Sequence, residues 1–590
     1  MVGDTGIAVH PNDQRYKSLV GKFAQHPFIK DRKLPITADT MVDMEFGTGA
    51  VKLTPAHDQN DWEAGLRNKL QVVNILNEDG TLNENAGEFE GMKRFDARMA
   101  IRKALEDKKL LRGDADNPMV VPVCSRTKDI IEPFLKPQWY LKCQNMANRA
   151  MDAVKKGDLK IHPSSYEKTW FSWLQDCHDW CISRQLWWGH RIPAYVVSTR
   201  KTSSDNWVKM NPANNGSWVT GRTFEEAMNN TKKMLKIADE NLIKLEQDED
   251  VLDTWFSSKL FPFSTMGWPN EKAADFKEFF PGSLLETGHD ILFFWVARMV
   301  MASLEFFDKL PFHTIYLHSM VRDAHGKKMS KSLGNAIDPV DVINGISLDE
   351  LHHQLSIGNL DPRELERAKA AQTADYPSGI PECGTDALRF ALCAYVSQGR
   401  NINLDILRVQ GYRFFCNKLW NATRFALYHC LGENYSPKED LASIMQPAHY
   451  AALSSIDKWI LSRCYHCMVK CDEAFKTYMF NEATTACYNF WLYELCDIYL
   501  EYSKPKTKVL VNGEMIKLDN EEADRTRAVL YYCLKLGLAM LHPFMPFITE
   551  ELFQRLTKMD TKRAISISVS SYPLPKDVSC DENLKIYIFL

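Results

Sequence analysis

The sequence lacks a long apolar stretch and has almost no excess of charge, and both absences restrict what the protein can be. The apolar run at residues 291–297 ends at Arg298, far short of the ~20 residues that a membrane helix needs. We therefore expect no membrane association. The net charge is −4 over 590 residues, so composition alone does not indicate nucleic-acid binding, although a local basic stripe would escape this measure.

A paired arrangement of cysteines suited to zinc is also lacking. The fifteen cysteines are an odd number scattered along the chain, which predicts reduced thiols in a cytoplasmic protein. Cys464, Cys467 and Cys471 lie at helical spacing, but zinc would need a second pair nearby, and none follows. Cys124 and Cys181 have no suitable partner either. We interpret the helical trio as small apolar residues on one buried face, and we expect no structural metal.

What is present is the composition of an ordinary globular protein, 45% hydrophobic and 25% charged. The length predicts about three or four domains. Short strand patterns at residues 6–11 and 49–55 predict a β-rich first part, in which residues 95–111 form a helix. Alternating strand and helix signals then continue to about residue 345.

From about residue 384 onward the pattern is helical. Thr385 is predicted to cap a helix that runs through Tyr395. Residues 454–475, 481–503 and 524–541 are long and amphipathic, which is typical of a helical bundle.

The most informative segment is the loop at residues 326–335, which carries three lysines, two serines and two glycines. It follows a strand-like run and precedes Asp338 and Pro339, which predict the N-cap and first residue of a helix. Ammonium and hydroxyl groups on such a loop suit the binding of a polyphosphate. Charge alone leaves the alternative open that this is a solvated surface loop.

Residues 328–332 read KMSKS and resemble the second signature of the class I aminoacyl-tRNA synthetases. Segments 180–193, 248–258 and 286–299 narrow the likeness to the valine-specific, eukaryotic-type branch of that family. The resemblance extends from residue 1 to about residue 575. It implies a multidomain α/β plus all-α protein in which the second half of a Rossmann-like catalytic core is combined with other domains.

The implied order has four parts. Residues 1–135 would form a partial β-rich editing domain, and residues 136–345 the C-terminal half of the catalytic domain with the KMSKS loop. Residues 346–445 would form a connecting helical module that contacts the RNA stem. Residues 446–590 would form the anticodon-binding helical bundle.

The resemblance implies a valine–tRNA ligase. ATP, bound with Mg²⁺, would activate valine as an acyl-adenylate, and the valyl group would pass to tRNA(Val). The enzyme would also hydrolyse threonyl-tRNA(Val). Positioning and electrostatics carry most of this catalysis, and no cofactor beyond ATP and Mg²⁺ is implied.

Two sets of residues follow from the motif match. Lys328 and Lys331 are the expected catalytic groups, because their charges would offset the charge on the departing pyrophosphate. The ATP site would comprise these two lysines with Met329, Ser330 and Ser332.

The valine pocket would be lined by Trp255, Asp290, Ile291 and Trp295. Ile291 and Trp295 would share one face of a helix, and the two tryptophans would limit the size of the pocket. Periodicity alone favours the alternative that these apolar side chains belong to the core.

Residues 47–62 resemble the hydrolytic pocket of the same family. A site shaped for valine rejects the isosteric threonine only weakly, so a second, more polar site is needed to hydrolyse the threonyl ester. We expect Asp61 to bind the substrate ammonium, with Lys52, Thr54 and Asp58 lining the pocket. For Asp58 the alternative is a helix cap.

The other class I signature, His-x-Gly-His, is missing, because none of the sixteen histidines has another three positions away. We therefore expect an N-terminally truncated chain, inactive alone, in which valine activation is slowed on the order of a thousand-fold or more. The alternative function is a non-catalytic tRNA-binding or regulatory protein derived from the synthetase. The missing histidines favour this alternative, and the intact KMSKS string favours the ligase.

Overall fold

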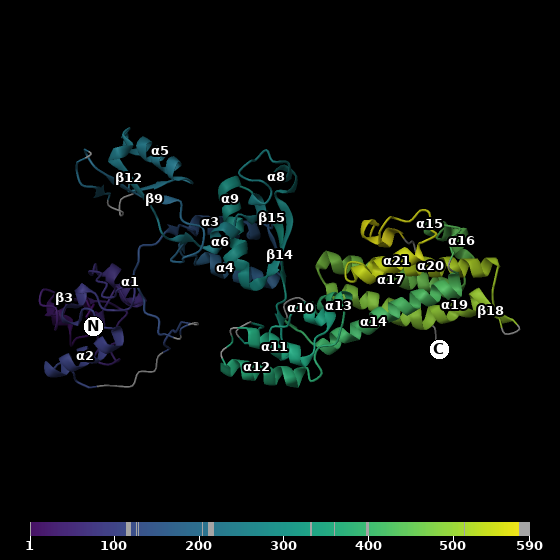
Figure 1. Cartoon of the computed structure of the whole chain (residues 1–590), viewed down its shortest axis with the longest axis horizontal. Coiled ribbons are helices and arrows are strands. Elements are labelled where there is room, and N and C mark those ends of the chain that lie inside the picture. Colours follow the sequence, from purple (N-terminus) through teal and green to yellow (C-terminus); the bar gives the residue numbers. More distant parts are fainter. Residues whose placement is uncertain are drawn as a thin grey trace. The chain divides into compact units, whose positions relative to one another are not determined.

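The structure is a computed structural model of the chain (Figure 1). It describes residues 2–113, 120–124, 127, 129–202, 204–210, 217–330, 333–358, 360, 362–396, 401–432, 434–511 and 514–577. The chain forms two compact units. The first contains residues 1–140 and 181–183, and the second contains residues 141–180 and 184–590.

The first unit is built on a mixed four-stranded sheet in the order β2-β3-β1-β4. Its strands are β1 (Gly6–Val9), β2 (Phe23–Gln25), β3 (Lys33–Ala38) and β4 (Ala50–Leu53). β1 pairs with β3 in parallel and with β4 antiparallel. Two helices complete the unit, α1 (Gln59–Arg67) and α2 (Arg94–Asp107). The sequence-based prediction of a β-rich part with one long helix is confirmed.

The second unit begins with a parallel three-stranded sheet in the order β14-β15-β6. Its strands are β6 (Lys160–His162), β14 (Gly282–Gly288) and β15 (Phe312–His318). Ile315 on the central strand is fully buried and is in register with Leu285 and Ile161. Helices α3 (Gln144–Lys155), α4 (Glu167–Gln175) and α9 (Arg298–Phe307) share its hydrophobic core. This covering suits a parallel sheet, which is normally buried.

A separate antiparallel sheet lies between these strands in the sequence. It is centred on β9 (Ala194–Thr199), which pairs with β10 (Val208–Lys209), β11 (Trp218–Thr220) and β12 (Ile243–Gln247). Helix α5 (Phe224–Leu235) adds its apolar face to a small core of its own.

Short helices follow the parallel sheet. α10 (Pro339–Asn344) begins where the sequence predicts, with the Asp338 carboxylate accepting a hydrogen bond from Val340 N. α11 (Leu348–Ile357) and α12 (Pro362–Asp375) come next. α13 (Thr385–Tyr395) begins at Thr385, but its N-cap is Gly384, so the prediction that Thr385 caps the helix is wrong.

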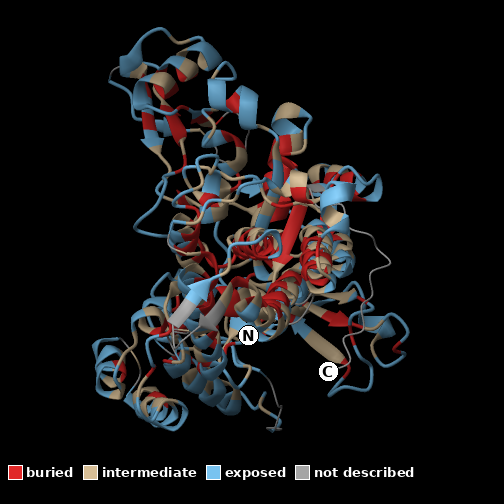
Figure 2. Cartoon of the chain, turned by 90° about the vertical axis from the view of Figure 1, so that its right-hand side faces the viewer, coloured by how far each residue is buried: buried red, intermediate tan, exposed pale blue. Residues whose placement is uncertain are grey.

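The remainder is a helical bundle, as predicted, whose helices run alongside one another (Figure 1). They are α14 (Ile406–Phe425), α17 (Ser455–Thr477), α18 (Phe480–Asn489), α19 (Leu500–Thr507), α20 (Glu521–Leu541) and α21 (Pro546–Leu556). A π-helical segment, Phe490–Tyr499, joins α18 to α19. Buried residues, drawn in red in Figure 2, gather where the helices pack against one another, and their side chains form one hydrophobic core. Across the described parts of the chain, no helix is both long and apolar enough to cross a membrane.

Arg527 on α20 is the one charged side chain among the largest fully buried groups that the described residues contain. Its guanidinium donates hydrogen bonds to the carbonyls of Cys430 (3.2 Å) and Thr507 (3.0 Å), and also to that of Leu518. It pairs with the Asp524 carboxylate at 3.0 Å. Thr507 is the last residue of α19, where helix carbonyls lack partners of their own. Arg527 thus satisfies backbone groups that water cannot reach.

We predict that Arg527→Leu destabilises the bundle by about 3–5 kcal/mol, because it leaves several buried oxygens unpaired. Urea unfolding followed by circular dichroism measures the change. Arg525→Leu on the same helix is the matched control, since the salt bridge of Arg525 is with the exposed Glu521 one turn earlier, and it should cost less than ~0.5 kcal/mol. Equal costs for the two variants would contradict this role of Arg527.

Candidate functional site

The candidate active site is built at the carboxyl ends of β14 and β15. These adjacent strands are parallel and in register, Gly288 opposite His318. The segment that follows each strand therefore leaves at the same edge of the sheet, where open α/β sheets place their ligands. Residues 289–297 follow β14, and the lysine-rich loop follows β15 after a short strand, β16 (Val321–Arg322).

The lysine-rich loop is held in shape by Asn335 and Asp323. Asn335 Oδ1 accepts a hydrogen bond from Ser330 N at 3.0 Å, and its Nδ2 donates to Asp323 Oδ2 at 2.9 Å and to Lys328 O at 3.2 Å. Asp323 Oδ1 accepts from Lys327 N at 2.7 Å. Burial raises the pKa of Asp323, but these hydrogen bonds outweigh it and hold the pKa below its usual value. Side-chain hydrogen bonds therefore hold the loop, together with one isolated backbone bridge between Arg322 and Lys328.

The predicted phosphate-binding residues differ in how far their side chains are exposed to solvent. Lys328 is exposed, as a residue that meets a ligand must be, and Ser330 is half-buried. Met329 packs against the helical core instead, which favours a packing role for its side chain. Lys331 and Ser332 lie outside the described residues.

A second contact ties the loop to helix α12. His325 Nε2 lies 3.0 Å from the Asp375 carboxylate. A cavity of about 1050 Å³ lies between the loop and α10–α12. Its lining includes Asn335, Asp338 and Arg367. The helices after β15 therefore form a wall beside the loop.

The predicted valine pocket lies where α6 (Thr254–Ser258) meets the segment after β14. Trp295 Nε1 donates a hydrogen bond to Ser258 O at 3.0 Å, which joins the two segments. Trp255 stacks on Phe294, with ring centroids 6.1 Å apart. The structure thus brings the elements that carry the two tryptophans together.

The expectation of a regular helix there is wrong. His289–Ile291 is a single 3₁₀ turn, and Leu292–Ala297 is π-helical. Short π-helical segments occur frequently at functional sites, because the extra residue per turn redirects side chains. Ile291 and Trp295 are half-buried, whereas Asp290 is exposed. None of the three belongs to the fully buried core that periodicity alone predicted.

Behind this pocket, Asp253 is the centre of a buried ionic network that the sequence analysis missed. Its carboxylate accepts hydrogen bonds from Trp180 Nε1 at 3.0 Å and Arg184 Nη2 at 2.7 Å, and Arg298 Nη1 lies 3.5 Å away. The Arg298 guanidinium lies 3.6 Å above the Trp180 ring. Asp253 also caps α6. A charged residue within an apolar helical run, such as Arg298, was the signal that could have revealed the network.

Lys259 extends this network as an ammonium group with an exposed fraction of only 6%. It lies 3.8 Å from the centre of the Phe256 ring and 5.5 Å from that of Trp180. Burial lowers the pKa of Lys259 to about 8, and the nearby Arg298 contributes in the same direction. The folded state therefore holds this proton less tightly than the unfolded chain does.

The predicted hydrolytic pocket is assembled in the first unit. Asp61 is buried, and its carboxylate accepts a hydrogen bond from Thr54 N at 2.8 Å. Lys52 Nζ lies 3.5 Å from the same carboxylate and donates to Thr54 Oγ1 at 3.0 Å. Thr54 Oγ1 in turn donates to Asp4 at 2.7 Å. Asp4, which the sequence analysis did not identify, is thus a fourth member.

Asp58 does not join this group. It is exposed and caps α1, accepting a hydrogen bond from Asp61 N at 3.0 Å. A helix cap is the alternative role given above for Asp58, and this geometry favours it.

We predict that Lys259→Met raises the unfolding free energy at pH 7 by about 1–2 kcal/mol, because it removes a desolvated charge. The unfolded chain binds more protons than the folded one between pH 8 and 10.5, so stability contributed by Lys259 rises with pH in this window. The advantage of the variant should therefore shrink from pH 8 towards pH 10. Urea unfolding of both proteins across this pH range measures the difference in unfolding free energy, with the exposed Lys272→Met as control. A difference that stayed constant with pH would refute the prediction.

Three family models match the chain. The model for tRNA synthetases class I (I, L, M and V) matches residues 61–405. A model for the leucyl-tRNA synthetase editing domain matches residues 12–106, and one for the anticodon-binding domain of tRNA ligase matches residues 457–588.

Curated relatives agree with these models. The chain is 54% identical to a valine–tRNA ligase of Rattus norvegicus over 98% of its length, which is 44% of that relative. It is 53% identical to one of Caenorhabditis elegans over 99% of its length and 54% of the relative. A mitochondrial valine–tRNA ligase of Saccharomyces cerevisiae is 51% identical over 97% of this chain and 50% of the relative.

The chain thus spans about half the length of these relatives. The class I model alone matches more than half of the 590 residues. The match to the editing-domain model agrees with the mixed sheet of the first unit, and the match to the anticodon-binding model agrees with the helical bundle of the second. This chain belongs to the class I tRNA synthetases of the I, L, M and V group.

Proposed function

We propose that this chain acts in the ATP-dependent joining of valine to tRNA(Val). The observation that carries the proposal is the lysine-rich loop after β15, whose described residues 327–330 are held by Asn335 and Asp323. The segment that carries Trp295 leaves the sheet at the same edge. The high identity with valine–tRNA ligases supports valine as the amino acid. ATP, accompanied by Mg²⁺, is the second substrate.

In the proposed reaction, the valine carboxylate attacks the α-phosphorus of ATP, and the bond to the leaving pyrophosphate breaks. Negative charge grows on that leaving group. The ammonium groups of Lys328 and Lys331 would stabilise it, which is an electrostatic contribution made in the transition state. Ser330 and Ser332 would add hydrogen-bond donors. Because Asn335 fixes the loop backbone, little ordering is needed when the phosphates bind.

The valine side chain would contact Trp255, Ile291 and Trp295. Trp295 already uses its only donor on Ser258, so its ring offers the substrate only apolar surface. The exposed Asp290 would bind a polar part of the substrate. An apolar slot of this kind selects by size, which explains the need for a second, hydrolytic site.

Hydrolysis of threonyl-tRNA(Val) would use the pocket of Lys52, Thr54 and Asp61. Asp61 is a buried carboxylate whose one cationic neighbour among the described residues, Lys52, is half exposed. It can therefore accept a substrate ammonium at little structural cost. Asp4 would orient the Thr54 hydroxyl through the 2.7 Å hydrogen bond.

The four-domain division at residues 135, 345 and 445 stays part of this proposal, with the helical bundle binding tRNA. The predicted location in the cytoplasm also stays a prediction. A second candidate function is tRNA binding without catalysis, which the absence of His-x-Gly-His from these 590 residues favours. Valine-dependent ATP–pyrophosphate exchange by this chain and by a longer chain that carries His-x-Gly-His distinguishes the two, because only the ligase exchanges label once that motif is present. Exchange by this chain alone would overturn the expectation that it is inactive.

We predict that Asn335→Ala, made in a longer chain that carries His-x-Gly-His, slows pyrophosphate exchange by about 100-fold, because the loop loses three hydrogen bonds that preorganise it. Filter binding of tRNA(Val) should not change. The exposed Asn270→Ala is the control and should leave exchange intact. Normal exchange by the Asn335→Ala variant would contradict the proposed role of the loop, whereas no exchange by the unaltered longer chain would favour the binding function.

We predict that Asp61→Asn lowers the rate of threonyl-tRNA(Val) hydrolysis by about 100-fold, because the ammonium loses its charged partner. Asp58→Asn removes a neighbouring carboxylate from a cap and should change the rate less than ~3-fold, with a loss of stability near 1 kcal/mol or less. Deacylation assays and melting curves of both variants measure these effects. If the two variants lost hydrolysis equally, the assignment of Asp61 would be wrong.

The tRNA partner is tested by filter binding at several salt concentrations. We expect this chain to bind tRNA(Val) more tightly than a tRNA for another amino acid, with an affinity that falls as salt rises, because phosphate contacts release counterions. Equal affinity for both tRNAs would contradict the proposed specificity for tRNA(Val). No binding at low salt would contradict both candidate functions.

A further inference from the structure

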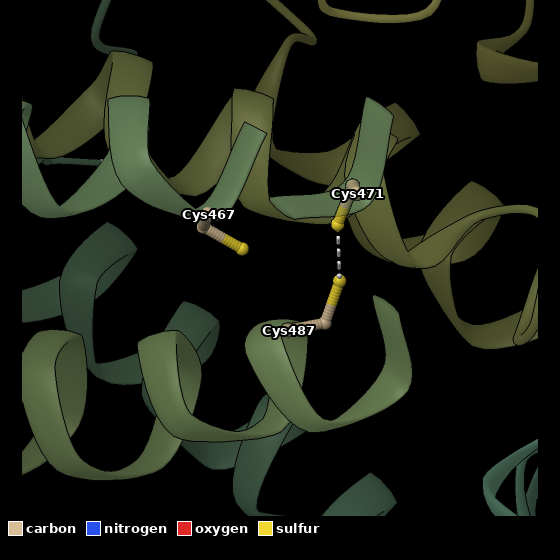
Figure 3. Close-up of side chains that lie close together, drawn as sticks. All are labelled: Cys467, Cys471 and Cys487. Atoms are coloured by element: carbon tan, nitrogen blue, oxygen red, sulfur yellow. Dashed lines mark hydrogen bonds between the residues drawn. The ribbon is translucent and has the colours of Figure 1, made fainter. Parts of the chain in front are cut away.

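Three buried cysteines meet in the helical bundle, on two helices that carry none of the candidate site residues described above. Cys467 and Cys471 lie on α17, and Cys487 lies on α18. Their sulfur atoms all lie within 4.8 Å of one another (Figure 3). The distance between the Cys471 and Cys487 sulfurs is 3.6 Å. Each of the three residues has an exposed fraction of 4% or less.

Helix geometry explains the cluster. Cys467 and Cys471 are separated by four residues, so they lie on one face of α17, one turn apart. The chain reverses at Tyr478, which adopts a left-handed conformation, and α18 packs back along that face. The Cys487 side chain then points at the Cys471 sulfur, 3.6 Å away, and the Cys467 sulfur lies to one side of this pair (Figure 3). Cys464, one turn earlier, faces Cys533 of α20 instead and is not part of the group.

The spacing of the sulfurs fits a common metal ion better than a disulfide. Three sulfurs bonded to one ion at ~2.3 Å in trigonal or tetrahedral geometry lie about 3.8–4.0 Å from one another. The observed separations are within reach of that value after small rotations of the side chains. A disulfide needs a sulfur–sulfur distance of about 2.05 Å and would leave the third thiol without a role.

An independent observation points to a ligand at the same place. The hydroxyl of Tyr572 is buried beside the Cys471 thiol and interacts with it, but no atom of the described residues, that thiol included, meets full hydrogen-bond geometry with it. Its ring is fixed edge-on against Phe475, with centroids 5.5 Å apart. A weakly satisfied buried hydroxyl costs free energy, and a bound ion would supply a stronger interaction.

We propose that Cys467, Cys471 and Cys487 form a binding site for one soft d¹⁰ cation such as Cu(I) or Cd(II). Thiolate sulfur is the ligand that such ions prefer. The three thiols bind as thiolates and release their protons to water, so three sulfur–metal bonds form and no electron is transferred. The Tyr572 oxygen completes the site as a neutral fourth neighbour.

This site escapes a search of the sequence for paired motifs. The spacing of four residues on α17 is that of an ordinary buried helix face, and Cys487 follows sixteen residues later on another helix. The expectation of no metal considered only short cysteine pairs. The occupied site would join α17 to α18 and stabilise the bundle, because the ion binds the folded arrangement and not the unfolded chain. It does not depend on the proposed synthetase chemistry.

The test is a titration of the full chain with Cd(II), after purification under reducing conditions with a chelator. The ultraviolet sulfur-to-cadmium band reports binding, and a competing chelator keeps isolated thiols from contributing. Cys467→Ala, Cys471→Ala and Cys487→Ala each remove one ligand. Cys416→Ala is the matched control, because Cys416 is equally buried but lies on α14, outside the cluster.

We expect the unaltered chain and the control to bind one equivalent of Cd(II) with the same affinity. Each of the three cluster variants should bind at least about 100-fold more weakly, and Cd(II) should raise the melting temperature only where the cluster is intact. Should an alanine variant lose its helical circular dichroism, the serine variant at that position replaces it. Unchanged affinity in any cluster variant, or an equal loss in the control, would overturn the proposal.

Discussion

The parallel pairing of β14 with β15 is the constraint on which the functional half of this molecule depends. Leu285 and Ile315 face each other in register, with Ile161 on the other side. A shift of one residue would turn every side chain of a strand to the opposite face of the sheet. The burial of Ile315 therefore fixes the register, and the register fixes where the segments that follow leave the sheet. For this reason, the segment that carries Trp295 and the one that leads to the lysine-rich loop leave the sheet at the same edge.

Polar side chains then hold the irregular segments that leave that edge. Asn335 closes the lysine-rich loop, and Asp253 anchors α6 through Trp180 and two arginines. Arg527 plays the same part in the bundle, where it satisfies carbonyls at the end of α19. In each case several hydrogen bonds compensate a polar group that is at least partly buried, so removal of that group leaves several partners unsatisfied. These networks hold the irregular segments in place where regular secondary structure does not.

Regular elements with strong periodicity were predictable from the sequence, and the exceptions have physical causes. The bundle helices and the cap at Asp338 follow from amphipathic spacing and from local capping chemistry, both of which act within a few residues. The π-helical segment at residues 292–297 was not predictable from local periodicity, and its Trp295 contacts Ser258, which is 37 positions away in the sequence. Met329 looked like a ligand contact by motif, yet an unbranched apolar side chain beside a large core packs into it.

The sequence by itself determined the family, the identity of the lysine loop and the order of β-rich, mixed and helical parts, because motifs and periodicities are local properties. Tertiary structure decided which distant residues meet. Asp4 joins Thr54 across fifty positions, Asp58 caps a helix while Asp61 turns inward, and Cys487 completes a cluster begun on another helix. Such contacts depend on how helices and strands pack against one another. The spacing of residues along the chain does not determine this packing, because one local pattern is compatible with many packing partners. Only the assembled hydrophobic core selects among them.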